Sequence, residues 1–280
     1  MRKKVVFLDI DGTLTIPGQN EPPASALEAI RKAQALGHYI FLCSGRNYGM
    51  LKPLLQYGFD GYVASSGGYI VCNDQIIYDS PMTKEQSDFA SEVLKRNGIF
   101  RTVECRDGSF TDEGFKTFLK ETAEAKGEGN SELLRWREQI ESSLNIRPME
   151  EYNGQPIYKM VMMAPTEESL TEPKELLKDI LNVVILGKEK DAFINGELVG
   201  KDFDKGLAVE RVCAYLNIPV EDSVGFGDSM NDREMLEKVG YSVCMENGTE
   251  EMKKLADHVC PAVEQDGLYQ GFEVCGLMRE

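Results

Sequence analysis

Asp9 and Asp11 stand one residue apart, where the apolar stretch 5–8 meets the turn Gly12-Thr13. Two unit charges about 4 Å apart repel by roughly 4 kcal/mol at the effective dielectric near a protein surface, so a cation is needed nearby. Alternation along a strand would send both carboxylates to the same side, where they could share one metal ion or one substrate. Such a pair is often only two solvated acids in a turn, but the apolar flank and the glycine favour a site. Oxygen ligands of this kind favour Mg²⁺.

Three further polar clusters follow or open neighbouring elements. Residues 44–46 (Ser-Gly-Arg) follow an apolar strand, residues 228–232 (Asp-Ser-Met-Asn-Asp) follow the stretch 225–227, and Lys205 opens a helix. The Ser44 hydroxyl and the Gly45 amide suit a phosphate oxygen. Taken singly, residues 44–46 fit an ordinary turn, and Lys205 fits the first turn of a helix, with Lys201 as a nearby alternative. Together with Asp9 and Asp11, the clusters predict one site.

The elements that would position these clusters alternate regularly at both ends of the chain. This β-α-β-α pattern predicts a doubly wound, parallel, Rossmann-like α/β sheet that is covered by helices on both faces. Parallel strands present their carboxyl ends at one edge, so all four clusters would meet there. The expected strands are 4–8, 39–43, 61–64, 223–226, 241–244 and 258–260; the expected helices are 24–36, 48–57, 204–217, 232–239 and 249–255; and 68–71 with 75–78 forms a hairpin around Asn73-Asp74.

The middle of the chain has a different order of strands and helices, which predicts an α+β insertion. Its strands are paired locally and its helices come in runs, which does not continue a wound sheet. We therefore expect a catalytic core of residues 1–81 and 202–280 and an inserted cap domain of residues 82–201. The expected strands are 101–106, 109–112, 157–164 and 183–186, with a hairpin-like 192–200; the expected helices are 84–97, 114–125, 131–144 and 167–181, with a loop at 125–130.

Composition narrows the possible partners and the compartment. The 31 lysines and arginines against 47 aspartates and glutamates give a formal charge of −16, which disfavours a nucleic-acid partner. No apolar run reaches the length of about 18 residues that a membrane helix needs, and the run after the basic start is too short for a signal peptide. The 7 cysteines are scattered, which disfavours disulfides and zinc. We expect a cytoplasmic protein with no membrane partner.

The four clusters, in this order, resemble the motifs of the haloacid dehalogenase-like hydrolase superfamily. The long insertion makes the chain most similar to the Cof-type sugar-phosphatase branch with a class IIB cap. Two segments depart from the pattern of that branch. Residues 65–68 (Ser-Ser-Gly-Gly) stand where an asparagine-glycine pair is frequent, and residues 245–248 (Met-Glu-Asn-Gly) replace a glycine-asparagine-alanine ending. Both lie outside the catalytic motifs, so they bear on substrate details.

The resemblance implies a Mg²⁺-dependent phosphatase that acts on a small phosphorylated metabolite, with roles for the residues that match its motifs. Asp9 would attack phosphorus to form an aspartyl-phosphate, and Asp11 would act as general acid and then base. Mg²⁺ would be held by Asp9, the backbone carbonyl of Asp11, and Asp228. The groups around the phosphoryl oxygens would be the Ile10 amide, Ser44, Gly45, Lys205 and Asn231. Supporting roles would fall to Thr13, which would fix the Asp11 side chain, to Asp232, which would orient Lys205 or a metal-bound water, and to Arg46.

Other activities remain compatible with these motifs. A phosphomutase of the phosphomannomutase type has the same cap class and core motifs. A phospho-aspartate receiver domain also combines acids, Mg²⁺ and a lysine, but it needs about half this length and places its acid after the third strand, where this chain has Ala64-Ser65-Ser66. A silent binding protein is disfavoured because every expected catalytic residue is present. Sugar phosphates, flavin mononucleotide and pyridoxal phosphate would suit the core equally, and we expect a monomer because the cap would cover the site.

Overall fold

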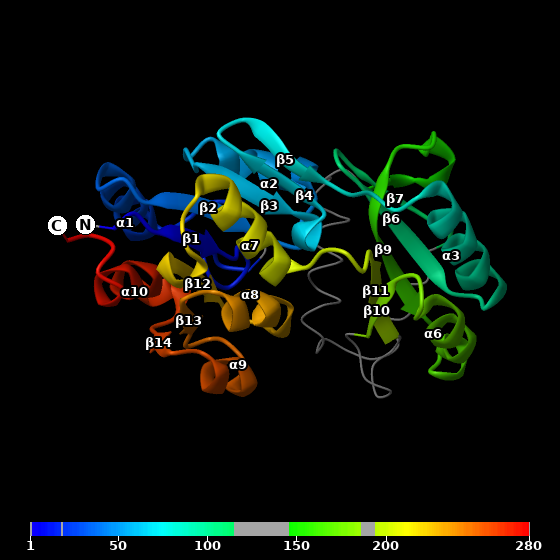
Figure 1. Cartoon of the computed structure of the whole chain (residues 1–280). Helices are drawn as coiled ribbons and strands as arrows, with labels where there is room; N and C mark the ends of the chain where they lie inside the picture. The colour runs from blue at the N-terminus through cyan, green and yellow to red at the C-terminus, as the bar shows by residue number, and fades with distance from the viewer. Residues whose placement is uncertain (1, 18, 115–145, 186–193, 280) are drawn as a thin grey trace. The chain divides into compact units, whose positions relative to one another are not determined.

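The chain divides into two compact units in the computed structural model, which describes residues 2–17, 19–114, 146–185 and 194–279 (Figure 1). The core unit comprises residues 1–46, 51–79 and 203–280, and the inserted unit comprises residues 47–50 and 80–202. Most of the helices expected at 114–125 and 131–144, with the loop expected at 125–130, lies outside the described residues, as do 186 and 192–193 of two expected strand segments.

The core unit is built on one sheet with the strand order β14-β13-β12-β1-β2-β3-β4-β5 among the described residues. The pairs from β14 to β3 are parallel, whereas β4 and β5 are antiparallel. Asn73 and Asp74, at positive φ (47° and 63°), form the turn of the expected hairpin. The strands are β1 (Val5–Leu8), β2 (Tyr39–Cys43), β3 (Gly61–Ala64), β4 (Tyr69–Cys72), β5 (Gln75–Asp79), β12 (Ser223–Gly227), β13 (Tyr241–Met245) and β14 (His258–Cys260).

Helices cover both faces of this sheet. On one face, Val5 and Phe7 of β1 share a buried cluster with side chains of α7, α8 and α9. On the other face, α1 lies beside α10 (Figure 1), and the rings of Phe226 and Phe272 are 5.3 Å apart. The expected doubly wound α/β fold is confirmed. The helices of this unit are α1 (Ala24–Ala35), α7 (Lys205–Leu216), α8 (Arg233–Lys238), α9 (Glu250–Leu255) and α10 (Gly267–Val274), while α2 (Tyr48–Leu55) begins in residues of the inserted unit.

The inserted unit contains a second, largely antiparallel sheet with the strand order β10-β11-β9-β6-β7-β8. One face of the sheet buries apolar side chains such as Met160 and Met162 against its helices. The strands are β6 (Phe100–Cys105), β7 (Ser109–Thr111), β8 (Ile146–Pro148), β9 (Ile157–Ala164), β10 (Asn182–Ile185) and β11 (Ile194–Val199), and the described helices are α3 (Lys84–Arg96) and α6 (Thr171–Leu177).

Two expectations for the inserted unit were wrong in detail. The helix expected at 167–181 is a short 3₁₀ turn, Glu168–Leu170, followed by α6, which ends at Leu177. Pro173 explains the late start, because proline is tolerated only in the first turn of an α-helix. The hairpin-like stretch expected at 192–200 contributes one strand, β11, which pairs with β9 and β10.

The opposite face of the inserted sheet carries a buried ion-pair cluster. The Lys159 ammonium lies 2.8 Å from a carboxylate oxygen of Glu197 and 3.4 Å from one of Glu104. Burial raises the pKa of Glu104, with Glu197 adding to this effect and Lys159 opposing it. Although burial acts to lower the pKa of Lys159, the two carboxylates raise it above its ordinary value, so this side chain is an ammonium.

Candidate active site

Three strands of the core sheet end immediately before polar residues. β1 ends at Leu8, β2 at Cys43 and β12 at Gly227, so Asp9, Ser44 and Asp228 come directly after neighbouring parallel strands. The carboxyl ends of such strands share one edge of the sheet, where ligands bind in folds of this kind. All three polar residues are buried, with exposed fractions of 4%, 3% and 8%.

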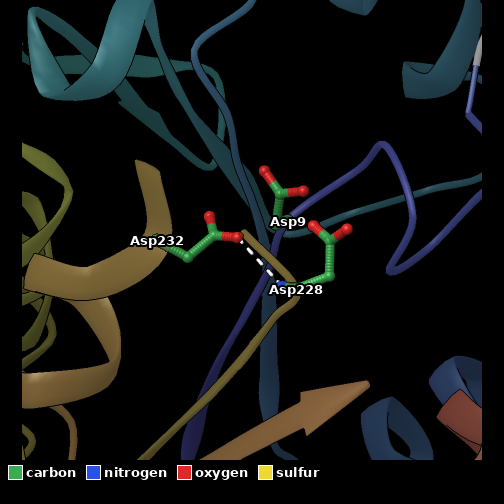
Figure 2. Close-up of side chains that lie close together, drawn as sticks. All are labelled: Asp9, Asp228 and Asp232. Carbon is green, nitrogen blue, oxygen red and sulfur yellow. Dashed lines mark hydrogen bonds between the residues drawn. The ribbon is translucent and has the colours of Figure 1, made fainter. Parts of the chain in front are cut away.

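A group of three carboxylates forms at this edge (Figure 2). Asp9, Asp228 and Asp232 each present an oxygen atom, and these atoms lie within 4.8 Å of one another. The pKa of Asp9 is raised well above its ordinary range by burial, then by the nearby Asp232 carboxylate; the Lys205 ammonium opposes this and Asp228 adds to it. Like charges at such spacing need cations close by.

Lys205 supplies one of these cations. Its ammonium donates hydrogen bonds to Asp9 Oδ1 at 2.7 Å and to Asp232 Oδ1 at 2.5 Å, and the residue is 1% exposed. Lys205 is the first residue of α7, whose N-cap Asp204 accepts a hydrogen bond from the Leu207 N–H at 2.6 Å. Burial acts to lower the pKa of Lys205, but Asp232 and Asp9 raise it well above its ordinary value. Lys205 therefore contacts the grouped carboxylates, whereas Lys201 is an exposed residue of the inserted unit.

Asp232 is held by donors from its own segment as well as by Lys205. Its Oδ2 accepts hydrogen bonds from the backbone N–H groups of Asp228 (3.0 Å) and Ser229 (3.2 Å). With Oδ1 bound to Lys205, both of its oxygens are engaged, so Asp9 and Asp228 are better placed to bind a metal ion. Three carboxylates and one ammonium leave two negative charges, and this all-oxygen donor set fits a divalent cation such as Mg²⁺.

The turn after β1 must pass very close to Asp228. Gly12 has φ +89°, and a Cβ atom there would lie 2.4 Å from Asp228 Oδ2, so only glycine fits. Asn247, from the loop after β13, donates a hydrogen bond to the Gly12 carbonyl at 2.8 Å. In the same loop, the Thr249 N–H donates to the Asp228 carbonyl at 3.0 Å. Asn247 was missed as a site residue, although its position after a strand of this sheet was a usable signal.

Asp11 lies in a different environment from Asp9. β1 ends before both residues, so strand alternation does not apply to them, and the carboxylates grouped for a metal ion among the described residues do not include Asp11. Its carboxylate instead accepts two hydrogen bonds from Arg46, from Nε at 2.9 Å and from Nη2 at 2.7 Å. The contact expected from Thr13 is not formed: its buried Oγ1 has no hydrogen-bond partner within the described part of the chain.

The turn after β2 is supported by the turn after β3. The Ser65 N–H donates to the Arg46 carbonyl at 2.8 Å, and the Ser66 N–H donates to the Ser44 carbonyl at 3.0 Å. Ser65 and Ser66 both have positive φ (50° and 57°), and Gly67 follows at φ 110°. Consecutive residues in this region of φ are strained, and such strain is concentrated at functional sites. The 65–68 segment therefore shapes the turn that carries Ser44.

The other expected phosphate-binding residues surround this edge of the core unit. Ile10 is fully buried directly after Asp9, and Gly45 is half-buried directly after Ser44. Asn231 is exposed, and its side-chain oxygen accepts a hydrogen bond from the Ser229 hydroxyl at 2.8 Å. Apart from Lys205, which opens α7, the expected core residues belong to segments that leave the same edge of one sheet.

This fold and site define a doubly wound α/β protein with a carboxylate centre at the switch point of its sheet. A family model for haloacid dehalogenase-like hydrolases matches residues 6–272. The chain therefore belongs to this hydrolase family, which confirms the resemblance of its four motifs. None of the helices in the described ranges is long and apolar enough to cross a membrane.

Proteins named as phosphatases match nearly the whole chain. It is similar to phosphatase YwpJ of Bacillus subtilis, with 25% identity over 95% of this chain and 97% of YwpJ. It is also similar to the HMP-PP phosphatase of Yersinia enterocolitica, with 25% identity over 90% of this chain and 86% of that protein. Among solved structures, the subclass IIB sugar phosphatase BT4131 has a TM-score of 0.75 and 22% identity, covering 98% of this chain and 100% of BT4131. The structural likeness supports the fold with its insertion.

Proposed function

We propose that this protein is a Mg²⁺-dependent phosphatase that hydrolyses a small phosphorylated metabolite through an aspartyl-phosphate intermediate. The observation that carries the proposal is the buried Asp9 carboxylate, held 2.7 Å from the Lys205 ammonium and grouped with Asp228. A nucleophile in this position faces a phosphate with a cation already in place, and positioned charge is the main catalytic requirement of phosphoryl transfer. Relatives named as phosphatases support the same reaction.

In the first step, an Asp9 oxygen forms a bond to phosphorus while the bond from phosphorus to the leaving alcohol oxygen breaks, and Asp11 supplies the proton to that alcohol. In the second step, water attacks the phosphorus of phospho-Asp9 and loses its proton to Asp11. The bond between Asp9 and phosphorus breaks, which releases free phosphate and regenerates the Asp9 carboxylate. The phosphoryl oxygens would be held by the Ile10 amide, Ser44, Gly45, Lys205 and Asn231.

Mg²⁺ would be held by Asp9, Asp228 and the backbone carbonyl of Asp11. When bound, it would offset the charge of the carboxylates and of the phosphoryl group that approaches them. Asp232 would not join this ligand set, because its oxygens are bound to Lys205 and to two backbone N–H groups. Its role would be to hold Lys205 and the Asp228 backbone in place.

Substrate choice would depend on residues of the inserted unit. The relatives include a sugar phosphatase and an HMP-PP phosphatase, both of which act on small phosphorylated compounds. We place the substrate in that broad class and propose a monomeric protein that acts in the cytoplasm. The free cysteines of the described chain, six of which are buried, suit a reducing compartment.

Hydrolysis of p-nitrophenyl phosphate with and without Mg²⁺ tests the proposal. We expect metal-dependent turnover that is lost in Asp9→Asn, because an amide cannot form the aspartyl-phosphate. Turnover that survives this substitution would reject the assignment of Asp9. Incubation with a hexose 1-phosphate and a sugar bisphosphate completes the test, since isomerised sugar phosphate without free phosphate would indicate a mutase instead. A screen of phosphorylated metabolites for phosphate release would then identify the substrate.

A further inference from the structure

Arg46 binds both oxygens of the Asp11 carboxylate. Its Nε donates to Oδ2 at 2.9 Å and its Nη2 donates to Oδ1 at 2.7 Å, which is the two-pronged geometry that arginine forms with carboxylates. The third guanidinium nitrogen, Nη1, donates to Asn20 Oδ1 at 2.7 Å. The Arg46 side chain is only 11% exposed, so this pair is less screened by water than an ordinary surface ion pair.

The backbone of Arg46 is fixed as firmly as its side chain. Its N–H donates to the Ser44 hydroxyl at 3.2 Å, and its carbonyl accepts from the Ser65 N–H at 2.8 Å. Ser65 belongs to the strained turn after β3, which the surrounding fold holds in place. Arg46 therefore links Asp11 to rigid elements of the core sheet, while Asp11 itself lies in a turn beyond the end of β1.

The geometry of this pair suits one of the two proposed roles of Asp11 better than the other. Two N–H donors aimed at two oxygens match an ionised carboxylate, which only accepts hydrogen bonds. A carboxylate offers about four acceptor positions, so the two hydrogen bonds from Arg46 do not by themselves prevent the group from receiving a proton. The arrangement therefore suits an Asp11 carboxylate that accepts a proton from water. Donation of a proton to the leaving group would instead require Asp11 to be protonated.

We propose that Arg46 is the positioning residue for Asp11 in the hydrolysis of phospho-Asp9. The inference rests on the proposed function and extends it. In this step water adds to phosphorus, its proton passes to the Asp11 carboxylate held by Arg46, and the bond between phosphorus and Asp9 breaks. Arg46 would act through the Asp11 carboxylate rather than on the phosphoryl group or the water. It acts by keeping the Asp11 carboxylate in one orientation, the role that Thr13 does not fill.

Rapid-mixing kinetics with p-nitrophenyl phosphate separate the two chemical steps. Formation of phospho-Asp9 releases p-nitrophenolate, whose departure needs little help from an acid, and hydrolysis then limits turnover. For Arg46→Ala we expect a burst of about one p-nitrophenolate per site followed by a slow steady rate. Positioned general bases contribute about 10²–10⁴-fold, so partial loss of position should slow hydrolysis by roughly 10–100-fold, with formation changed by less than about threefold.

Two further measurements test whether the guanidinium itself is required. Added guanidinium ion should restore hydrolysis in Arg46→Ala, because it can occupy the vacated space and bind both oxygens of Asp11. Arg46→Lys keeps the charge but loses the fork, so its hydrolysis rate should fall between those of the wild type and the alanine variant. It also serves as the informative variant if Arg46→Ala does not fold, which thermal unfolding would reveal.

Arg96→Ala is the matched control. Arg96 makes a similar two-pronged contact with Glu172, at 3.1 and 2.7 Å, but lies in the inserted unit, and its loss should change neither step. Equal slowing of both steps by Arg46→Ala, a greater effect on formation, no effect, or no rescue by guanidinium would each overturn the proposal. Failure of the proposed function would look different, because Asp9→Asn would then retain turnover.

Discussion

Asp228 and Asp232 belong to the same turn but are held very differently. Asp232 accepts hydrogen bonds from Lys205 and from two backbone N–H groups, one of which is that of Asp228 itself. The Asp228 carboxylate instead lies against Gly12 and faces Asp9 (Figure 2). At the scale of single residues, we therefore expect chemically identical side chains to have different roles: Asp228 would bind the metal ion, and Asp232 would position its neighbours. The division follows from which donors are within reach of each carboxylate.

This division predicts different defects for the two amide variants. Asp228→Asn should raise the Mg²⁺ concentration needed for half-maximal activity by at least about tenfold, because a charged ligand is lost. Asp232→Asn should lower kcat by roughly 10–100-fold, as is typical for residues that support metal ligands, with a smaller change in the Mg²⁺ requirement. Titration of p-nitrophenyl phosphate hydrolysis with Mg²⁺ measures both. Identical titration shifts in the two variants would contradict the assignment.

At the scale of elements, the turn after β1 and the loop after β13 together fix the edge of the site. Gly12 brings its backbone against Asp228, and Asn247 holds the Gly12 carbonyl from a position 235 residues away in the sequence. These contacts join segments whose strands, β1 and β13, both flank β12. The position of the Gly12 turn against Asp228 is therefore set by how closely these segments approach, which no single element determines.

Gly12→Ala tests this close approach, and Gly58→Ala is its matched control. Both glycines have positive φ (+89° and +82°), so both substitutions carry a similar backbone strain of about 1 kcal/mol or more. Only at Gly12 would the new methyl group collide with Asp228, whereas nothing lies within 4 Å at Gly58. We expect both variants to melt at lower temperature but only Gly12→Ala to need more Mg²⁺. A normal Mg²⁺ titration for Gly12→Ala would count against the close approach.

The inserted sheet provides a second prediction at this scale. Lys159→Met leaves the buried Glu104 carboxylate beside Glu197 without its ammonium, and removal of one partner from a buried ion pair costs about 3–5 kcal/mol. We expect the free energy of unfolding to fall by an amount in that range. Urea denaturation monitored by circular dichroism measures it. A loss below about 1 kcal/mol would mean that water already screens the pair.

Glu104→Gln should behave differently and depend on pH. Burial raises the pKa of Glu104, so the folded state binds its proton more tightly than the unfolded chain, where the pKa is about 4.3. The resulting stability is fully present below the unfolded pKa and is lost as pH rises through the folded pKa. The unfolding free energy of Glu104→Gln relative to the wild type should therefore increase with pH above about 4.3. A difference that stays constant across this range would refute the effect.

At the scale of the whole molecule, the core unit is discontinuous in sequence but complete as a sheet. The strands after the insertion (β12–β14) form one side of its order and the strands before it (β1–β5) form the other, and the two groups meet where β12 pairs with β1. The insertion also leaves and returns close together, because the Ser80 hydroxyl donates to Asp202 at 2.7 Å. We propose that the two units are separate domains, with the boundaries expected at residues 81/82 and 201/202.

Replacement of residues 82–201 by a short glycine-serine loop tests this division. We expect the joined core to unfold cooperatively and to keep Mg²⁺-dependent hydrolysis of p-nitrophenyl phosphate, since its buried cluster and site residues are all retained. Its rates on different phosphorylated metabolites should become similar, because the residues proposed to select substrate are gone. Thermal unfolding and a metabolite screen measure these outcomes. A core that does not unfold cooperatively would show that the units depend on each other for folding.

Much of the fold was predictable because its signals are local. The strands at 39–43, 61–64, 157–164 and 258–260 were expected with the observed bounds, since short apolar runs between turn residues mark them. Helix α10 was missed because Gly267 and Gly271 lower its helix propensity. Tertiary packing explains why glycine stands at both positions. A Cβ atom would lie 1.8 Å from the Pro261 carbonyl at Gly267 and 2.5 Å from the Phe226 ring at Gly271.

The sequence by itself determined which residues lie at the carboxyl edge of the core sheet. Asp9, Ser44 and Asp228 each follow an apolar strand, and parallel strands bring such positions together whatever lies between them. Only the tertiary structure decided which residues of the neighbouring turns and loops contact one another. Arg46 meets Asp11 across 35 positions and Asn247 meets Gly12 across 235, and no local pattern encodes either contact. Periodicity reports which side of an element is buried, whereas side-chain pairing depends on distances that exist only after distant segments have packed together.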